Sequence, residues 1–110
     1  MKADYKDNSQ QILSAMEKGI KNGLEAIGLT AETYAKKATP VDTGRLRNSI
    51  SHTVDGEAAY IGSNVEYAPY VELGTSRAKA HHMLQKAATE HSAEYKRLAE
   101  DAFYNAINNI

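Results

Sequence analysis

The stretch ISHTVDGEAAYIGS, residues 50–63, separates two long helical patterns and decides the fold. In its first half, apolar residues and His52 alternate with serine and threonine, as in a strand with one covered face. Asp55-Gly56 follows, a dipeptide typical of two-residue hairpin turns, and a second strand is expected over residues 57–63. The sequence therefore predicts a β-hairpin in the middle of the chain.

A long amphipathic helix is predicted before the hairpin, from the capping residues Asn8-Ser9 to Thr39-Pro40. Apolar residues recur there every three or four positions, which is the spacing of one helical face. They are Ile12, Met16, Ile20, Leu24, Ile27, Ala31, Tyr34 and Ala38. Gly19, Gly23 and Gly28 cost about 1 kcal/mol each inside a helix. Either another element packs very close to them, or the helix breaks near Gly28.

The second half of the chain begins with residues 65–73, which fit a third strand or a short helix ended by Gly74. A polar, basic loop is predicted over residues 75–80, and a second long helix over residues 83–110. The fold class is therefore α+β, with two long helices packed on a small antiparallel sheet, either a hairpin or a three-stranded meander. We expect a single domain over residues 1–110, with residues 1–9 flexible.

Composition excludes several classes of function. The chain of 110 residues has no cysteine, which rules out disulfide frameworks, thiol catalysis and cysteine-based zinc sites. Its 13 Lys and Arg against 14 Asp and Glu give a net charge of -1, so no global field attracts nucleic acid or anionic lipid. Because no apolar run could cross a bilayer or form a signal peptide, we expect a soluble protein that is intracellular when made and has no membrane contact.

Helix length points to assembly. A helix of about 27 residues spans about 40 Å, whereas a compact domain of this size is roughly 34 Å across. Helices of that length overhang their own core, and an overhanging amphipathic face needs a partner. We therefore expect oligomerisation or docking into an assembly.

Two patterns invite a catalytic or metal interpretation. Asp42-Thr43-Gly44 is the tripeptide of aspartic proteases, but Arg45 and Arg47 beside it would keep both carboxylates of a shared dyad ionised, so a helix or turn cap is favoured. His81-His82, Glu90 and His91 are of metal-ligand type. They are spread over about 14 Å of helix, too far for one ion. With no phosphate loop or nucleophile elbow, we expect neither an enzyme nor a cofactor.

Basic and aromatic residues flank the predicted sheet. Arg45 and Arg47 form one short basic cluster, and Arg77 and Lys79 form another; either could meet phosphate or an acidic protein surface. Three tyrosines bracket the hairpin and the segment after it, and each suits a core edge or an interface equally well. They are Tyr60, Tyr67 and Tyr70.

Three ordered motifs carry a family resemblance: ATPVDTGRLRNSI at residues 38–50, YIGS at 60–63 and EYAPYVELGT at 66–75. In this order, between a leading and a closing helix, they resemble the tail-completion, neck or head–tail joining proteins of long-tailed phages and prophages. The chain departs from that family where it reads AHHML at residues 80–84, because the family has a proline-containing entry to its last helix.

The resemblance implies a minor structural protein of the virion, assembled in the host cytoplasm and acting at the head–tail junction in a ring or collar. Its partners would be head-closure, tail-terminator or tail-tube proteins and further copies of itself, with DNA nearby. It supplies no catalytic residue. The partner-binding candidates are Arg45, Arg47, Tyr70, Glu72, Arg77 and Lys79.

Arg45 and Glu72 both lie in the matching motifs, and we expect them to form a hydrogen-bonded pair that braces the turn and the loop. Two other functions are weighed against the tail protein. One is a small nucleic-acid-binding module that uses the basic segments around Arg45 and Arg77. The other is a hydrolase that uses Asp42.

Overall fold

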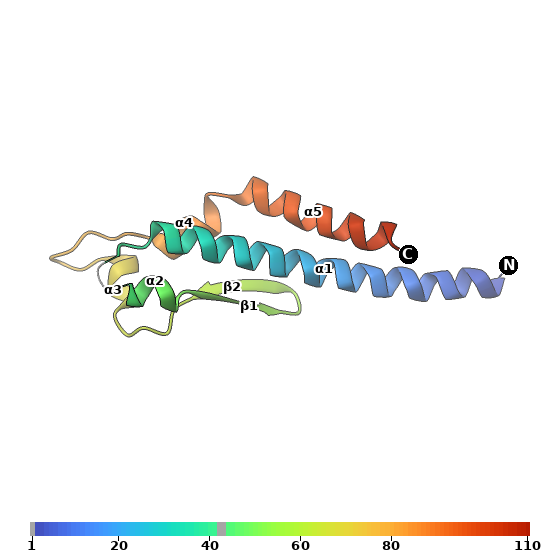
Figure 1. Ribbon diagram of the computed structural model, residues 1–110, viewed down its shortest axis with the longest axis horizontal. Helices are drawn as coiled ribbons and strands as arrows, with labels where there is room; N and C mark the ends of the chain where they lie inside the picture. Colours follow the sequence, from blue (N-terminus) through green and yellow to red (C-terminus); the bar gives the residue numbers. More distant parts are fainter. Residues whose placement is uncertain (1, 42–43) are drawn as a thin grey trace.

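The chain is organised along one helix, α1 (Lys2–Ala38), which forms the long axis of the molecule (Figure 1). A computed structural model describes the backbone of residues 2–41 and 44–110, and the side chains from Ser9 onward within these ranges. The molecule measures 70 × 24 × 21 Å. Its radius of gyration is 18.5 Å, against about 13 Å for a compact domain of this length.

α1 is continuous, so close packing and not a break explains its glycines. A Cβ at Gly19 would lie 2.9 Å from the Cα of Phe103, and one at Gly28 would lie 2.7 Å from the ring of His52. Because these glycines have no side chain, the helix that carries Phe103 and the hairpin that carries His52 approach the α1 backbone closely, from two directions. α1 begins earlier than the predicted Asn8-Ser9 cap. Flexibility of residues 1–9 stays a prediction.

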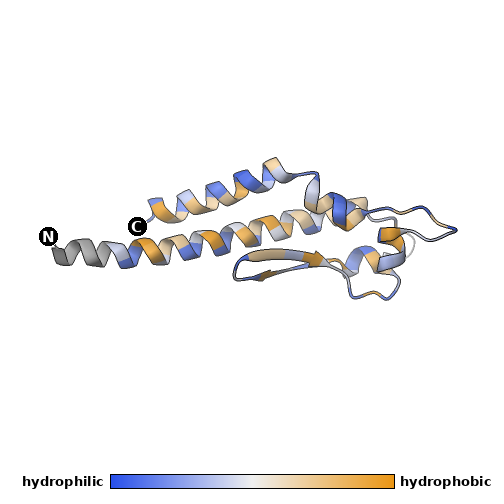
Figure 2. Cartoon of the chain, turned by 180° about the vertical axis from the view of Figure 1, so that it is seen from behind, coloured by the Kyte–Doolittle hydropathy of each residue, from blue (hydrophilic) through white to orange (hydrophobic). Residues whose placement is uncertain are grey.

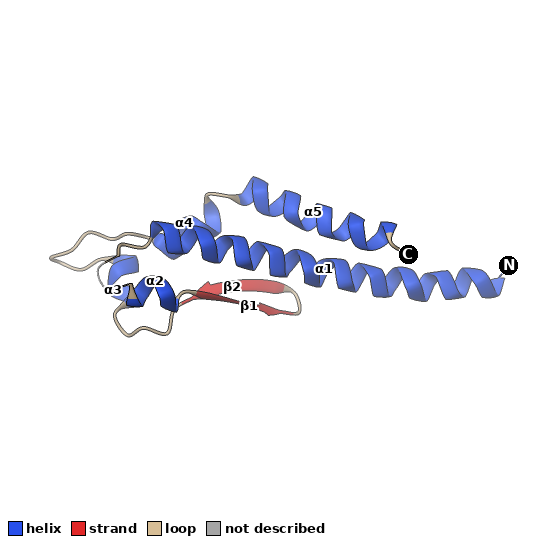
Figure 3. Cartoon of the chain, in the orientation of Figure 1, coloured by secondary structure: helices blue, strands red, loops and turns tan. Residues whose placement is uncertain are grey.

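The predicted hairpin is present as β1 (Ser51–Asp55) and β2 (Ala58–Gly62), paired antiparallel from Ser51↔Gly62 to Asp55↔Ala58. Its two-residue turn is Gly56-Glu57, one position later than predicted, and Gly56 takes a φ of +47° that glycine tolerates. Figure 3 shows the hairpin running alongside α1. His52 and Ile61, which face each other across the two strands, contact α1 residues.

Two short helices flank the hairpin: α2 (Arg45–Ser49) and α3 (Ala68–Leu73). Of the two alternatives for residues 65–73, the helix is correct, and the sheet of the described residues has two strands. Pro69 explains the choice, because proline suits the first turn of a helix but removes a hydrogen-bond donor from a strand.

The prediction of one closing helix was wrong, because the chain forms α4 (Met83–Thr89) and α5 (Ser92–Asn108) with a break at Glu90 and His91. His91 leaves the helical region at φ −123°, ψ 30°. Its ring stacks on Tyr34 of α1, with centroids 3.5 Å apart and planes 3° from parallel. The Tyr34 hydroxyl also donates to the Glu94 carboxylate. This contact with α1 overrides the local helical pattern and turns α5 back along α1 (Figure 1).

The core lies at one end of this elongated molecule, around the C-terminal part of α1. One buried cluster joins α2, α3 and the start of α4, and the other joins α1, α4 and the residue between α2 and β1. The first is Leu46, Val65, Ala68 and Met83, and the second is Ala35, Ile50 and Ala87. No residue of α5 is buried. The expected overhang of the helices beyond the core is therefore confirmed, and Figure 2 shows that apolar residues continue along α1 into the overhanging part.

Within the part of the chain that the structure describes, no helix combines the length and the apolar character needed to cross a membrane.

Candidate functional site

All six predicted partner-binding residues lie at the end of the molecule that holds the core. We call this end the tip: α2, α3 and the loop of residues 74–82 that leads to α4 (Figure 1). Arg45 and Arg47 are on α2, and Tyr70 and Glu72 are on α3. Arg77 and Lys79 are in the loop.

The loop has a defined turn at its base. The Thr75 backbone N–H donates to the Ala78 carbonyl at 2.8 Å, and the Thr75 hydroxyl accepts from the Ala78 backbone N–H at 3.0 Å. Gly74, at φ +80°, leaves no room for a side chain, since a Cβ there would lie 2.8 Å from the Ala80 nitrogen. This turn holds the exposed cations Arg77 and Lys79 at the outermost part of the tip.

Large apolar side chains are also exposed at the tip. Tyr70 is 62 % exposed and Leu73 is 71 % exposed, both on α3, and Val41 before α2 is also exposed. A hollow of about 550 Å³ also lies at the tip and is lined in part by Val41, Tyr67 and Val71. Exposed apolar side chains together with arginine are the composition of a protein-docking surface.

The expected pair of Arg45 and Glu72 was wrong. The two guanidinium nitrogens of Arg45 donate to the Glu66 carboxylate at 3.0 and 3.3 Å, and the guanidinium lies 5.5 Å from the centre of the Tyr67 ring. The pKa of Glu66 is lowered, first by its own backbone N–H and then by Arg45. Arg45 therefore braces the start of α3 and not the loop.

Glu72 instead caps α4. Its two carboxylate oxygens accept from the backbone N–H groups of Leu84 at 2.8 Å and Gln85 at 3.0 Å, where a helix N-terminus leaves such groups without partners. The carboxylate also complements the positive end of the helix dipole. Glu72 thus joins the two ends of the loop of residues 74–82, because it lies just before the loop and binds the first turn of the helix after it. The expected bond to Arg45 is not formed.

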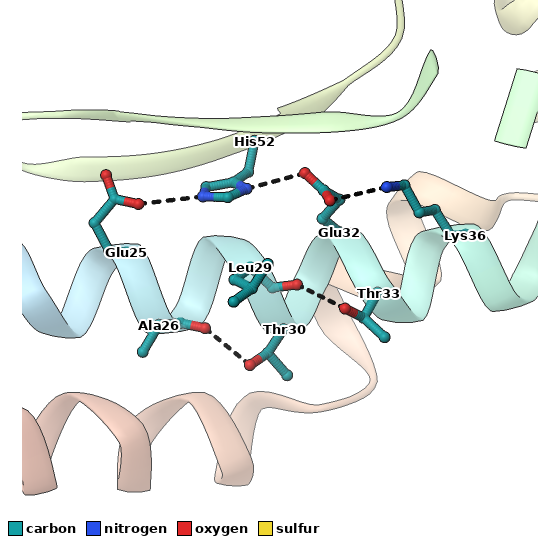
Figure 4. Close-up of polar contacts among 8 residues, drawn as sticks. All are labelled: Glu25, Ala26, Leu29, Thr30, Glu32, Thr33, Lys36 and His52. Atoms are coloured by element: carbon teal, nitrogen blue, oxygen red, sulfur yellow. Dashed lines mark hydrogen bonds and ion pairs between the residues drawn. The ribbon is translucent and has the colours of Figure 1, made fainter. Parts of the chain in front are cut away.

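The hairpin is fastened to α1 by a cluster that sequence reasoning missed (Figure 4). His52 Nδ1 lies 3.0 Å from a Glu32 oxygen, and its Nε2 lies 3.2 Å from a Glu25 oxygen. The other Glu32 oxygen accepts from the Lys36 ammonium at 3.0 Å. The signal was present: Glu25 and Glu32 are seven residues apart on one helical face, and His52 alternates onto the covered face of β1.

Electrostatics of this cluster favour its charged form. The pKa of His52 is raised, mainly by the hydrogen bond to Glu32 and also by the one to Glu25, against the opposing effect of burial. The pKa of Glu32 is lowered, mainly by the hydrogen bond to His52 and then by the one to Lys36. The cluster is a charged bridge between the sheet and the long helix.

The catalytic and metal candidates gain no support. Asp42 and Thr43 lie outside the described residues. His91 stacks on Tyr34, while His81 is exposed at the tip. Among the residues that the structure describes, no three histidine, aspartate or glutamate side chains are grouped to hold a metal ion.

Comparison with family models gives a match over residues 3–74, to the family described as "Bacteriophage HK97-gp10, putative tail-component". The chain belongs to this HK97-gp10-like family. The match covers most of α1, the hairpin, α2 and α3. It includes the first two motifs that carried the resemblance and the third as far as Gly74, and that resemblance is confirmed. Comparisons with curated proteins and with solved structures gave no match. An HK97-gp10-like chain is a structural tail component of a bacteriophage.

Proposed function

We propose that this HK97-gp10-like protein completes the tail at the phage head–tail junction, as a neck subunit in a ring or collar. It works by protein–protein contact and not by catalysis, and it is assembled in the host cytoplasm into the virion. The observation that supports this role is the tip, which exposes both the large apolar side chains of Tyr70 and Leu73 and the cations of an ordered loop.

The tip matches what a protein interface needs. Aromatic and arginine side chains contribute most of the binding free energy at interfaces, and Tyr70, Arg47 and Arg77 are all exposed. Glu72 and Arg45 support them from within the tip, through the α4 cap and the Glu66 pair. The partner that fits is an acidic surface with an apolar hollow, on a head-closure, tail-terminator or tail-tube protein.

Homo-oligomerisation belongs to the same proposal. A head-to-tail contact between identical subunits generates a ring when the rotation closes. The subunit is elongated, so its tip can contact one neighbour in the ring while the rest of α1 contacts another. The DNA that enters the tail passes close to subunits in that position.

The test is complementation of a phage that lacks this gene. We expect Tyr70→Ala combined with Arg77→Ala to yield separate heads and tails in electron micrographs, because losing interface anchors weakens binding by roughly tenfold or more. Tyr60→Ala is the matched control, since Tyr60 is 57 % exposed but lies on β2, away from the tip. Joined, infectious particles from the tip variant would contradict the proposal, provided that the variant melts at the wild-type temperature.

The alternative is a nucleic-acid-binding module that uses the basic segments around Arg45 and Arg77. The Glu66 carboxylate offsets the charge of Arg45, so Arg77 and Lys79 would supply most of the attraction. That function predicts a gel shift at low salt that weakens steeply as salt is raised. It also predicts that the shift is lost in an Arg77→Ala/Lys79→Ala variant.

A further inference from the structure

An apolar stripe on α1 lies away from the tip and is only partly covered by the rest of the chain. We call it the α1 stripe: Leu13, Met16, Ile20, Leu24 and Ile27. Leu13 and Ile20 are both about half exposed. Beside the stripe is a second hollow, of about 300 Å³, which is almost entirely apolar and is bordered on the α5 side by Phe103 and Tyr104.

The stripe runs between the two elements that pack on α1. α5 lies over Gly19 and the hairpin lies over Gly28, as the close approaches at these glycines require. At about 100° per residue, Ile20 and Ile27 fall between those two directions. The hollow beside the stripe is lined by α1 and α5, so α5 forms one wall of it and the stripe its floor.

The stripe is complementary to a reversed copy of itself. Leu13, Ile20 and Ile27 are seven residues apart, which is the repeat that lets two helices pack along a continuous seam. The set is symmetric about Ile20. A second α1 running in the opposite direction therefore sets Leu13 against the partner subunit's Ile27, and Ile20 against its own copy.

Charges on one flank of the stripe point to the same arrangement. Glu17 and Lys21 lie on the same side of the seam, three residues before Ile20 and one residue after it. In the antiparallel pair, Glu17 comes within about 3 Å, measured along the axis, of the partner subunit's Lys21, and the symmetry makes this contact twice. A parallel pair places these residues on opposite flanks, where they do not meet.

We propose that the α1 stripe is the seam of an antiparallel, two-fold dimer of this chain, which forms before or apart from the contacts of the tip. The two α5 helices lie on the same side of the seam and complete a four-helix bundle with the two α1 helices. Tyr104, exposed at the edge of the hollow, is then covered by the partner.

The oligomeric state of the full chain is the first test, by sedimentation equilibrium at micromolar concentrations. The wild type is expected to be a dimer. Ile20→Glu introduces a charge at the centre of the seam and should weaken dimerisation by about a hundredfold, because an unpaired charge is costly to bury. Leu29→Glu is the matched control: Leu29 is 56 % exposed against 48 % for Ile20, but it lies on the opposite face of α1, so this variant should remain a dimer.

The direction of pairing is tested by cross-linking, which is simple because the chain has no cysteine. Under mild oxidation, a Leu13→Cys/Ile27→Cys variant should form a covalent dimer, whereas Leu13→Cys alone should not. A wild-type chain that stays monomeric at about 100 μM would overturn the proposal, as would cross-linking of Leu13→Cys alone or equal dissociation by Leu29→Glu. Circular dichroism of each variant shows that the chain is folded, and none of these readouts depends on tail completion.

Discussion

Single side chains fix how the hairpin sits on α1, and His52 is the clearest example. Its raised pKa means that the stabilisation from its protonated form is complete below the unfolded value of about 6.5 and is lost as the pH rises through the folded pKa. Glu32 has a lowered pKa, so its contribution is complete above its unfolded value of about 4.5 and is lost as the pH falls through the folded pKa. The two windows overlap between about pH 4.5 and 6.5.

We therefore expect the melting temperature to be highest in that range and to decline as the pH rises through the raised pKa of His52. His52→Gln should lower the melting temperature in the acidic range and flatten the alkaline decline, because the group that loses its proton is gone. The measurement is a series of thermal melts followed by circular dichroism. His81→Gln is the control, since His81 is exposed at the tip. An unchanged alkaline decline in His52→Gln would show that another group causes it.

Gly19 allows α5 to lie directly on the α1 backbone. Gly19→Val places a Cβ 2.9 Å from the Cα of Phe103, a backbone atom that can yield only if the helices move apart. We expect the free energy of unfolding to fall by about 1–3 kcal/mol, the usual cost of overpacking, as measured by urea titration. Asn22→Val adds the same side chain at an exposed position of the same helix and should change stability by at most about 0.5 kcal/mol. Equal effects of the two variants would mean that helix propensity, and not contact, is responsible.

At the scale of elements, α4 depends on α3 for its first turn. The residue at its own N-cap, His82, makes no side-chain capping bond, so Glu72 is the side chain that fills this role. Glu72→Ala should cost about 1 kcal/mol of unfolding free energy, as loss of a helix cap typically does. Glu72→Gln keeps an acceptor and should recover part of this loss. The exposed Glu90, at the other end of α4, provides the control variant Glu90→Ala, and an effect as large as that of Glu72→Ala would contradict the assignment.

Elements with a regular period were predictable from the sequence, and those set by distant contacts were not. The hairpin and α1 follow from alternation over residues 50–63 and from the three-to-four spacing before them. The break at His91 depends on a stack with Tyr34, far away in the sequence, and no local pattern reports it. Tertiary contact decided that boundary against helical propensity.

The role of the six candidate residues in partner binding stays a prediction, whereas the pairing expected among them was wrong. Arg45, Tyr70 and Glu72 come from separate motifs, and the structure places them at one end of the molecule. The partner of Arg45 depended on whether residues 65–73 form a strand or a helix. In a strand, Glu66 and Glu72 would share a face, because they are an even number of positions apart. In the structure Glu66 precedes α3 and pairs with Arg45, while Glu72 faces α4.

Across the whole molecule, stability is distributed unevenly. Among the described residues, the buried side chains lie between Ala31 and Ala87, and α5 contributes none. Regions with little buried apolar surface open with a lower free energy than the core. We expect amides of α5 and of α1 before Gly19 to exchange with deuterium about tenfold faster, or more, than those of β1 and of α1 after Gly28. The measurement is best made on the Ile20→Glu variant, because dimerisation then does not protect α5 and the part of α1 before Gly19. Uniform protection of amides along the whole length of the molecule would contradict the expectation.

The unbroken course of α1 gives the molecule a fixed length. Its 37 residues span about 55 Å at 1.5 Å per residue, and no kink or turn in it can lengthen or shorten that span. The return path through α4 and α5 changes direction at Glu90 and His91, where the stack of His91 on Tyr34 and the hydrogen bond from Tyr34 to Glu94 tie it to α1. The chain therefore has a fixed length, and it sets the spacing between whatever binds its two ends.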